Sequence, residues 1–419
     1  MNARGAATTT AAVVVVGGGP AGAYTAWALA RQGVDVLVAD RSRFPRGKPC
    51  AEFLSPQASR LLDQMGVLEE VERAGPAYLY GMTVHAPDGT VFSGRFGSAR
   101  SACGAPDRGL ALPREVLDTI VLDRSRAAGA RIAEGVRVTD LLRDGDGRVT
   151  GVRARTAESE TVDIRARLVV GADGLRSVVA RRLGLARSAR WPRRMAFVAH
   201  YRGVDGIGAC GEMHVTANGY CGLADVGDCV TNVGVVVPAT AARAAGGATD
   251  HFMDRWIGAH PALAARFARA TRIDGVQCTG PFASRARRAW APGAALVGDA
   301  ADFYDPFTGE GIYAALRGGE LLAPHVLDAL GADGSRAADA ALAAYDRERT
   351  VEYSSKWRVE QLVAIGVAVP AIFNHVARAL GRRQGLADLL VGVAGDVVPH
   401  REVLRPGFLL RLLLPTGIR

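Results

Sequence analysis

The sequence predicts a mixed α/β (α+β) protein in which a parallel-sheet domain is interleaved with an antiparallel β-sheet domain and followed by a helical C-terminal region. Three observations predict this fold. Residues 12–16 have the apolar pattern of a buried strand and lead through a glycine turn into a helix and a second strand. Several runs between residues 194 and 237 alternate as half-buried strands do, and residues 346–419 have a helical pattern.

The composition indicates a globular chain with a sizeable core. Of the 419 residues, 49% are hydrophobic and 22% are charged, which argues against disorder. The net charge of +9 comes almost entirely from arginine, because Lys48 and Lys356 are the only lysines. The arginines form only short clusters, so we interpret the charge as compositional bias and expect no nucleic-acid partner.

The cysteines and the apolar segments indicate the cellular compartment in which the protein is expected. No two of the six cysteines form a C-x-x-C pair, so we expect no metal site and a reducing environment. The apolar stretch at residues 13–16 is too short for a signal-peptide core, and neither 362–373 nor 408–414 approaches the roughly 20 residues that span a bilayer. A cytoplasmic protein is therefore expected. For residues 403–419, which mix Leu and Phe with Arg, packing on the protein's own core is favoured over peripheral contact with the inner face of the membrane.

The first elements form one βαβ unit. Residues 12–16 are predicted as a strand, residues 21–31 as a helix that breaks at Gly33, and residues 34–39 as a second strand. The crossover between the two strands is expected to be right-handed.

The next elements are a helix and three strands. The helix begins at Arg114 and ends near Gly129, and the strands cover residues 136–142, 148–154 and 162–168. A sequence Asp-Gly-Asp-Gly between the first two strands is a strong turn signal. We expect these strands to form a small antiparallel layer beside the main sheet.

Four β-rich runs, divided by Gly and Asn turns, predict the second domain, and the chain then returns to a buried strand at residues 294–297 and a helix from Gly311. The runs cover residues 195–201, 211–215, 220–226 and 229–237. The predicted boundaries are residues 1–75, 107–185 and 276–345 for the first domain, 76–106 and 186–275 for the second, and 346–419 for the helical region.

The turn after the first strand reads Gly17-Gly18-Gly19-Pro20-Ala21-Gly22. Gly17 permits the tight turn, Gly19 lets the backbone approach a pyrophosphate, and Gly22 lets helix and strand pack closely. The helix N-terminus favours the phosphate charge. Asp40 ends the second strand about 20 residues further on, where a carboxylate binds ribose hydroxyls. Together these features predict a Rossmann-like dinucleotide-binding unit.

A second motif lies near the end of the first domain. Gly298-Asp299 follows the buried strand, and residues 305–312, Asp-Pro-Phe-Thr-Gly-Glu-Gly-Ile, open the next helix. A carboxylate in this place can bind a chain of hydroxyls, and a glycine-rich helix start can place N–H dipoles beside an anion. Reduced flavin carries such a charge at its N1/O2 edge. Alone, the segment is equally well explained as a turn and helix cap.

With Gly171-Ala172-Asp173-Gly174 between them, these segments resemble, in order and spacing, the three fingerprints of the group A flavoprotein monooxygenases and geranylgeranyl reductases, over roughly residues 12–324. The resemblance implies a glutathione-reductase-type FAD-binding domain with bound FAD. The implied cofactor residues are Gly17, Gly19, Pro20, Ala21 and Gly22 at the turn, Asp40, Arg41 and Val138 near adenosine, Arg114, Asp173 and Asp299 near the phosphates and ribityl chain, and Cys50, Ala51, Pro306, Gly309, Gly311 and Ile312 near the flavin ring.

Details of the sequence separate the branches of that superfamily. Residues 48–56 resemble the Pro-Cys-Gly segment of geranylgeranyl reductases, whereas their aromatic motif, Y-x-W-x-F-P, is reduced here to residues 220–225. The tryptophan motif of flavin halogenases has no counterpart. Cys50 is the one candidate for a reactive group near the flavin, although a small buried hydrophobic residue is the favoured interpretation of this cysteine. His200, His214 and Tyr220 are candidates for the substrate cavity, although core or surface placement is the favoured interpretation of each.

The predicted function is that of an FAD-dependent oxidoreductase. Because no second glycine motif lies in a βαβ unit of its own, NAD(P)H is expected as a transient electron donor. The favoured hypothesis is an O2-dependent monooxygenase, a hydroxylase or epoxidase, that acts on a hydrophobic aromatic or unsaturated small molecule of secondary metabolism. The first alternative is a C=C reductase with Cys50 or a water as proton donor. A halogenase and a non-catalytic flavin- or lipid-binding module are less favoured.

Overall fold

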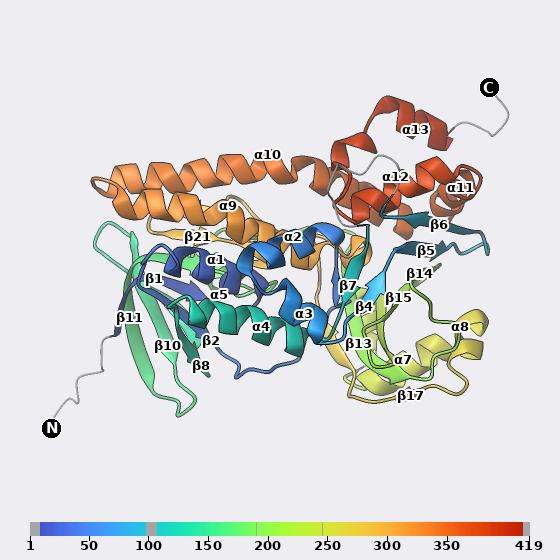
Figure 1. Cartoon of the computed structure of the whole chain (residues 1–419), viewed down its shortest axis with the longest axis horizontal. Coiled ribbons are helices and arrows are strands. Elements are labelled where there is room, and N and C mark those ends of the chain that lie inside the picture. Colours follow the sequence, from blue (N-terminus) through green and yellow to red (C-terminus); the bar gives the residue numbers. More distant parts are fainter. Residues whose placement is uncertain (1–8, 98–106, 190, 245, 414–419) are drawn as a thin grey trace.

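The computed structural model describes residues 9–97, 107–189, 191–244 and 246–413, and it confirms the mixed α/β fold class. Two large sheets lie side by side, each with helices packed against it (Figure 1). The long helix α10 (Ser335–Ala368) runs along one edge of the molecule, from the first sheet to the second (Figure 1).

The main sheet is built around β1 (Thr9–Val16), which pairs in parallel with β2 (Val36–Asp40) and β11 (Thr161–Gly171). Residues 13–15, all valine, have no exposed surface, as is typical of a parallel strand that is buried on both faces. The parallel part also includes β8 (Arg131–Glu134) and β21 (Ala294–Leu296), and β20 (Trp290–Ala291) pairs antiparallel at its edge.

Helix α1 (Pro20–Ala30) lies close to β1 because Gly22 has no side chain. A Cβ at Gly22 would lie 1.9 Å from the carbonyl oxygen of Gly17. The helices α4 (Arg114–Ala127) and α9 (Gly311–Gly331) pack against α1. Three shorter helices in the same part of the chain are α2 (Pro56–Met65), α3 (Leu68–Arg73) and α5 (Val178–Arg182).

The hairpin of β9 (Arg137–Arg143) and β10 (Val149–Arg155) continues the main sheet, so the expectation of a layer beside that sheet is wrong. The reason is the length of β11, which has 11 residues. Its residues 161–165 pair with β10 and its residues 169–171 pair with β21, while its other edge pairs with β1. One long strand therefore belongs to both parts.

The second sheet is mostly antiparallel and has the strand order β17-β13-β16-β15-β14-β5-β6. Alternate residues of its strands point to two different cores, since Phe197 packs with the helices α7 (Thr249–Gly258) and α8 (Pro261–Arg266) while Ala196 packs on the opposite face. The strands are β5 (Gly81–His85), β6 (Val91–Arg95), β13 (Arg194–Arg202), β14 (Gly211–Thr216), β15 (Gly219–Asp225), β16 (Val230–Pro238), β17 (Thr271–Arg272) and β18 (Gln277–Thr279).

Both predicted pieces of the second domain contribute strands to this sheet. The strand β18 pairs with β13 as well, although Gln277 lies inside the segment assigned to the first domain. Two three-stranded sheets connect the domains: β3 (Phe53–Leu54), β7 (Gly109–Ala111) and β4 (Ala77–Leu79) form one, and β12 (Ala186–Ser188), β19 (Ser284–Ala286) and β22 (Asp302–Phe303) form the other.

The C-terminal helices cover the second sheet. The helix α10 begins inside the segment assigned to the first domain, and α11 (Pro370–Gly381) and α12 (Gln384–Ala394) pack against β6. In α13 (Pro406–Leu413), Phe408 and Leu412 are buried. Within the described residues no single helix has the length and apolar character to cross a bilayer. The helices α10 and α11 reach that length and apolar character only as a pair, and their axes are bent by 112° relative to each other.

Tyr345 fixes α10 to the main sheet. It has no exposed surface, and its hydroxyl donates a hydrogen bond of 3.0 Å to the carbonyl oxygen of Leu296 in β21. We expect Tyr345→Phe to lower the free energy of unfolding by about 1 kcal/mol and Tyr345→Ala by about 3–5 kcal/mol, because the second change also leaves a cavity. Urea titration measures both values, and a Tyr345→Ala protein as stable as the wild type would contradict this packing role.

Candidate functional site

One elongated cavity extends from the glycine turn at the N-terminus of α1 to the second sheet. Its walls come from both domains and from α10, so segments far apart in the sequence meet there. The residues predicted from the sequence that line this cavity are Gly19, Pro20, Ala21, Cys50, Ala51, Arg114, Tyr220, Asp299, Pro306, Gly309, Gly311 and Ile312.

Gly17, Gly22, Asp40 and Asp173 are predicted cofactor residues that do not line the cavity. Gly17 has a φ of +104°, and a Cβ there would lie 2.5 Å from the carbonyl oxygen of Ala172. The Asp173 carboxylate accepts hydrogen bonds from Ser177 Oγ and the Val178 amide, both at 2.6 Å, and burial raises its pKa. Asp173 therefore caps α5 and stabilises the fold.

Two residues expected near adenosine lie away from the cavity wall. Val138 is buried in the core at strand β9 of the main sheet, and Arg41 is exposed. The structure therefore does not bring these two side chains to the cavity with the glycine turn.

Asp40 is held by backbone amides beside the glycine turn. Its Oδ2 accepts a hydrogen bond of 2.7 Å from the Gly18 amide, and its Oδ1 accepts one of 2.7 Å from the Ser42 amide. The carboxylate is 7% exposed. This fixed position beside the turn suits a contact with ribose hydroxyls.

Two guanidinium groups share one carboxylate at this end of the cavity. Arg114 donates two hydrogen bonds of 2.7 Å to Asp118, and Arg46 Nη1 lies 3.0 Å from the same carboxylate. Arg46 Nη2 lies 3.5 Å from the position of a Cβ on Gly19, where nothing else is closer than 4 Å. The surplus positive charge and the open space beside Gly19 suit a pyrophosphate.

Sequence reasoning missed Arg46. The available signal was the concentration of basic residues directly after the second strand, where Arg41, Arg43, Arg46 and Lys48 follow one another within eight positions. The sequence does not show which of them turns toward the glycine turn, because that depends on the path of an irregular loop.

The second motif forms the middle of the cavity wall. Asp299 pairs with Lys48 at 3.4 Å, and both side chains line the cavity. Gly309 has a φ of +76°, which turns the chain into α9 at Gly311. The first N–H groups of this 21-residue helix have no partner within the helix, and the helix dipole favours an anion beside them.

The residues present fit an FAD molecule. The end of the cavity with Gly19 and two arginines suits its pyrophosphate, and the wall with Asp299 suits its ribityl hydroxyls. The start of α9 suits the electron-rich edge of its flavin ring. The apolar face of the second sheet lies beyond and leaves room for another molecule.

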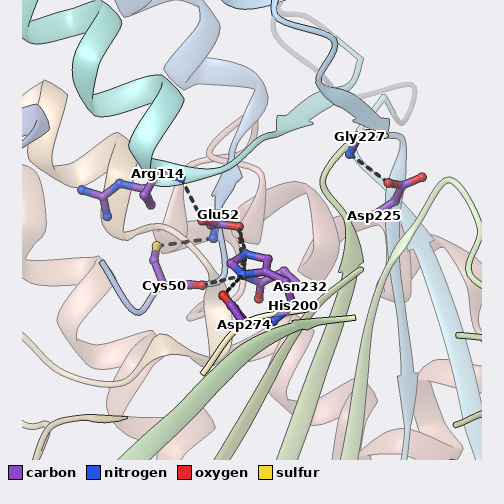
Figure 2. A network of polar contacts seen from close by, with 8 residues as sticks. All are labelled: Cys50, Glu52, Arg114, His200, Asp225, Gly227, Asn232 and Asp274. Atoms are coloured by element: carbon purple, nitrogen blue, oxygen red, sulfur yellow. Dashed lines mark hydrogen bonds and ion pairs between the residues drawn. The ribbon is translucent and has the colours of Figure 1, made fainter. Parts of the chain in front are cut away.

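A network of polar side chains holds Cys50 and its neighbours against the second sheet (Figure 2). His200 lies between two carboxylates, with Nε2 2.8 Å from Glu52 Oε2 and Nδ1 2.7 Å from Asp274 Oδ2. Asn232 donates hydrogen bonds to the Cys50 carbonyl at 2.9 Å and to Glu52 at 3.0 Å. His200 therefore positions the Cys50 segment, and it is not one of the residues that line the cavity.

His214 points to the other face of the second sheet. It lies 2.8 Å from Glu212, whose carboxylate also pairs with Arg266, and its ring stacks on His85 at a centroid distance of 4.1 Å. The ligand atoms of His85, Glu212 and His214 lie within 4.8 Å of one another, but Arg266 already neutralises the carboxylate. The absence of a metal stays a prediction.

Tyr220 lines the cavity, and its hydroxyl is bound to Asp305, which lines the cavity as well. The hydroxyl donates a hydrogen bond of 2.6 Å to Asp305, and Arg194 donates one of 2.7 Å to the other oxygen of that carboxylate. Arg194 also reaches the Ala364 carbonyl of α10 at 2.9 Å. All three side chains are buried, so Tyr220 is a fixed wall residue.

A second buried ionic cluster lies behind the start of α9. Lys356 donates hydrogen bonds to Glu310 at 3.1 Å and to Glu360 at 2.6 Å, and His400 bonds to the other oxygen of Glu310. Burial opposes ionisation of Glu310, but Lys356 and His400 lower its pKa. Burial and the charge of Glu310 raise the pKa of Asp396 far above its usual range. Glu310 is thus ionised, whereas burial and the neighbouring charge of Glu310 favour the protonated form of Asp396.

The open space beside Gly19 leads to a direct prediction. A Gly19→Val protein should fold and lose FAD, because the new side chain occupies the position of the pyrophosphate. Gly145→Val is the matched control, since Gly145 lies in an exposed turn with nothing within 4 Å of its Cβ position. Flavin absorbance per chain after purification measures the loss, and a folded Gly19→Val protein with stoichiometric FAD would refute this placement.

The pairing of His200 makes stability depend on pH. Burial alone lowers the pKa of His200, but the bonds to Glu52 and Asp274 outweigh it and raise the value from 6.5 to about 9. The charged form therefore stabilises the fold fully below pH 6.5, and the contribution disappears as the pH rises to about 9.

We expect the wild type to lose about 2 kcal/mol of unfolding free energy over that range and His200→Gln to lose much less. Urea titrations at several pH values measure the slope, with His251→Gln as a control, since His251 is exposed. Equal slopes in the wild type and in His200→Gln would contradict the assignment.

Three known proteins show what this chain is similar to. It is 30% identical over 330 residues to digeranylgeranylglycerophospholipid reductase 2 of Methanopyrus kandleri, covering 76% of this chain and 77% of that one. It is 28% identical over 409 residues to menaquinone reductase of Mycolicibacterium smegmatis, covering 92% and 91%. Its fold resembles that of a flavin-dependent brominase, with a TM-score of 0.80 and 20% identity over 96% and 98% of the two chains.

A family model also matches most of the chain. The model describes an FAD binding domain and matches residues 10–354, which include the glycine turn, the Asp173 segment and the start of α9. The chain therefore belongs to this FAD-binding flavoprotein family and is an FAD-dependent oxidoreductase.

Proposed function

We propose that the protein is a monooxygenase that uses NAD(P)H and O2 to introduce oxygen into a hydrophobic aromatic or unsaturated small molecule. The observation that carries the proposal is the continuity of the cavity, which joins the start of α9 to an apolar face of the second sheet. A substrate on that face lies directly beside the flavin edge of the FAD site.

The wall of this part of the cavity suits oxygen chemistry. Phe282, Phe303 and Phe307 line it together with aliphatic residues of β13 and β16, so a hydrophobic ring can displace water from it. Exclusion of water protects a reactive oxygen species from side reactions. When bound, FAD supplies the redox chemistry, taking electrons from NAD(P)H and activating O2.

The residues of this chain provide binding, orientation and charge. The α9 N-terminus and Lys48 favour negative charge that develops beside the flavin, and Asp299 orients the ribityl chain. Glu310 and Lys356 pair with each other in the cavity wall and hold the start of α9 against α10. Tyr220 and Asp305 fix the substrate wall against the flavin edge.

A C=C reductase is the second candidate, and a specific observation favours it. The two curated relatives named above are reductases, and one of them matches this chain over nearly its whole length. In that reaction a hydride passes to one carbon of the double bond and a proton to the other. Cys50 lines the cavity and is the candidate proton donor, with a water as the alternative.

We place the enzyme in the cytoplasm and propose peripheral contact with the membrane through α13. Phe408 and Leu412 of this helix pack on the protein, whereas Leu410 and Leu413 are 54% and 64% exposed, with Arg411 between them. Apolar side chains next to arginine are typical of a helix at an anionic lipid surface. Such contact would give the enzyme access to a lipophilic substrate.

The proposed activity is tested with isotopically labelled O2. The holoenzyme, NADPH or NADH and a panel of hydrophobic phenols, quinones and polyenes are incubated with labelled O2, and products are analysed by mass spectrometry. We expect one labelled oxygen atom in the product and substrate-dependent O2 consumption. NAD(P)H oxidation that continues without O2, with a product two hydrogens heavier and no label, would overturn the monooxygenase proposal and support the reductase.

A further inference from the structure

Two glycines lie side by side at the centre of the second sheet. Gly234 of β16 pairs with Gly222 of β15, and the same row continues to Val198 of β13 and Met213 of β14. All four residues line the cavity. The middle of the sheet therefore presents bare backbone to the cavity, with a larger side chain at either side.

The backbone does not require glycine at position 234. Its φ lies outside the left-handed region, and a Cβ there would meet no heavy atom within 4 Å. At Gly222 the nearest atom to a Cβ is the flexible Sδ of Met213 at 3.3 Å. Gly219, three residues before Gly222, is different, because a Cβ there would lie 2.2 Å from the Val236 carbonyl oxygen.

A glycine in the middle of a strand has a cost. It loses more conformational entropy on folding than other residues, and it leaves no side chain to pack on its neighbours. Where neither φ nor close backbone approach demands glycine, the remaining reason is that another molecule needs the space. At Gly234 neither φ nor a close neighbour demands glycine. At Gly222 the only close neighbour of a Cβ is the flexible Met213 side chain.

We propose that Gly222 and Gly234 form the floor of the substrate site and act as its specificity-determining residues, admitting a flat conjugated ring against the bare peptide groups. Neighbouring strands lie about 4.8 Å apart, so Val198 and Met213 stand roughly 14 Å from each other across this floor. The floor between Val198 and Met213 is wide enough for one or two fused rings. A side chain at Gly222 or Gly234 would occupy the space that such rings need.

Aromatic side chains of the same cavity match the same ligand. Phe303 and Phe307 line the cavity, and the ring of Phe307 meets that of Tyr220 edge to face at 5.1 Å. A flat ring in this cavity has bare backbone and aromatic side chains as partners, which give it large contact area without fixing any polar group. The inference rests on the proposed function only in naming the ligand a substrate; the site itself is tested by binding.

The test uses the oxidised FAD-loaded protein and naphthol, a flat bicyclic phenol. Binding is followed by the change in flavin absorbance, so no turnover is needed and a failure of the proposed reaction leaves this test unaffected. We expect saturable binding to the wild type and a dissociation constant about tenfold higher in Gly234→Val and in Gly222→Val, because each new side chain overfills the floor. Flavin content and Tm should be unchanged or higher in Gly234→Val, since valine suits a strand.

Gly275→Val is the matched control, because Gly275 lies outside the cavity and nothing lies within 4 Å of its Cβ position. It should bind naphthol as the wild type does. Farnesol, an open-chain polyene alcohol, is the competing probe. Equal naphthol affinity in the wild type and Gly234→Val would overturn the proposal, and so would a wild type that binds farnesol and not naphthol.

Discussion

The carboxylate of Asp305 is the interaction on which the shape of the cavity depends. It accepts hydrogen bonds from the Tyr220 hydroxyl at 2.6 Å, Arg194 at 2.7 Å and the Phe307 amide at 3.1 Å. These partners belong to β15, β13 and the loop before α9, and Arg194 continues to Ala364 of α10. A buried charge is tolerated only when it is fully paired, so these segments keep one relative position. The substrate wall is thereby fixed against the cofactor wall.

Two further networks hold the same loop and the Cys50 segment. Glu310 and Lys356 connect the start of α9 to α10, and Glu52 and His200 connect the Cys50 segment to β13. Each network joins an element of the first domain to one outside it. Because buried polar networks rigidify the groups that they connect, the two domains act as one support for the cavity. A site between rigid walls can orient a bound ring without many contacts of its own.

The sequence predicts the cofactor side of this structure well, because its constraints are local. The Gly17 to Gly22 turn must follow a strand and begin a helix, and the same is true of the segment that leads to Gly311. The substrate side depends on which strands become neighbours. His200 and His214 lie on strands that are buried on both faces, so alternation alone does not show which face meets the cavity. Asp305 accepts a hydrogen bond from Arg194, which lies 111 residues earlier in the chain. No sequence motif indicates a contact over such a separation.

The glycines of the floor illustrate the same limit. Gly222 belongs to a segment that differs from the aromatic motif of the reductase branch, and in the sequence this looks like a loss. In the structure Gly222 lies beside Gly234, and because neither residue has a side chain, the two positions leave a space on the sheet. Only the strand register, set by tertiary packing, makes these two positions neighbours.

A crystal structure of the FAD-loaded protein tests most directly whether cofactor and substrate meet in this one cavity. The flavin ring should lie along the start of α9, between Gly309 and Ile312, with its free edge toward Gly222 and Gly234 and its pyrophosphate beside Gly19. A flavin ring bound elsewhere, or turned so that the start of α9 and the glycine floor lie on unconnected sides of it, would contradict that arrangement.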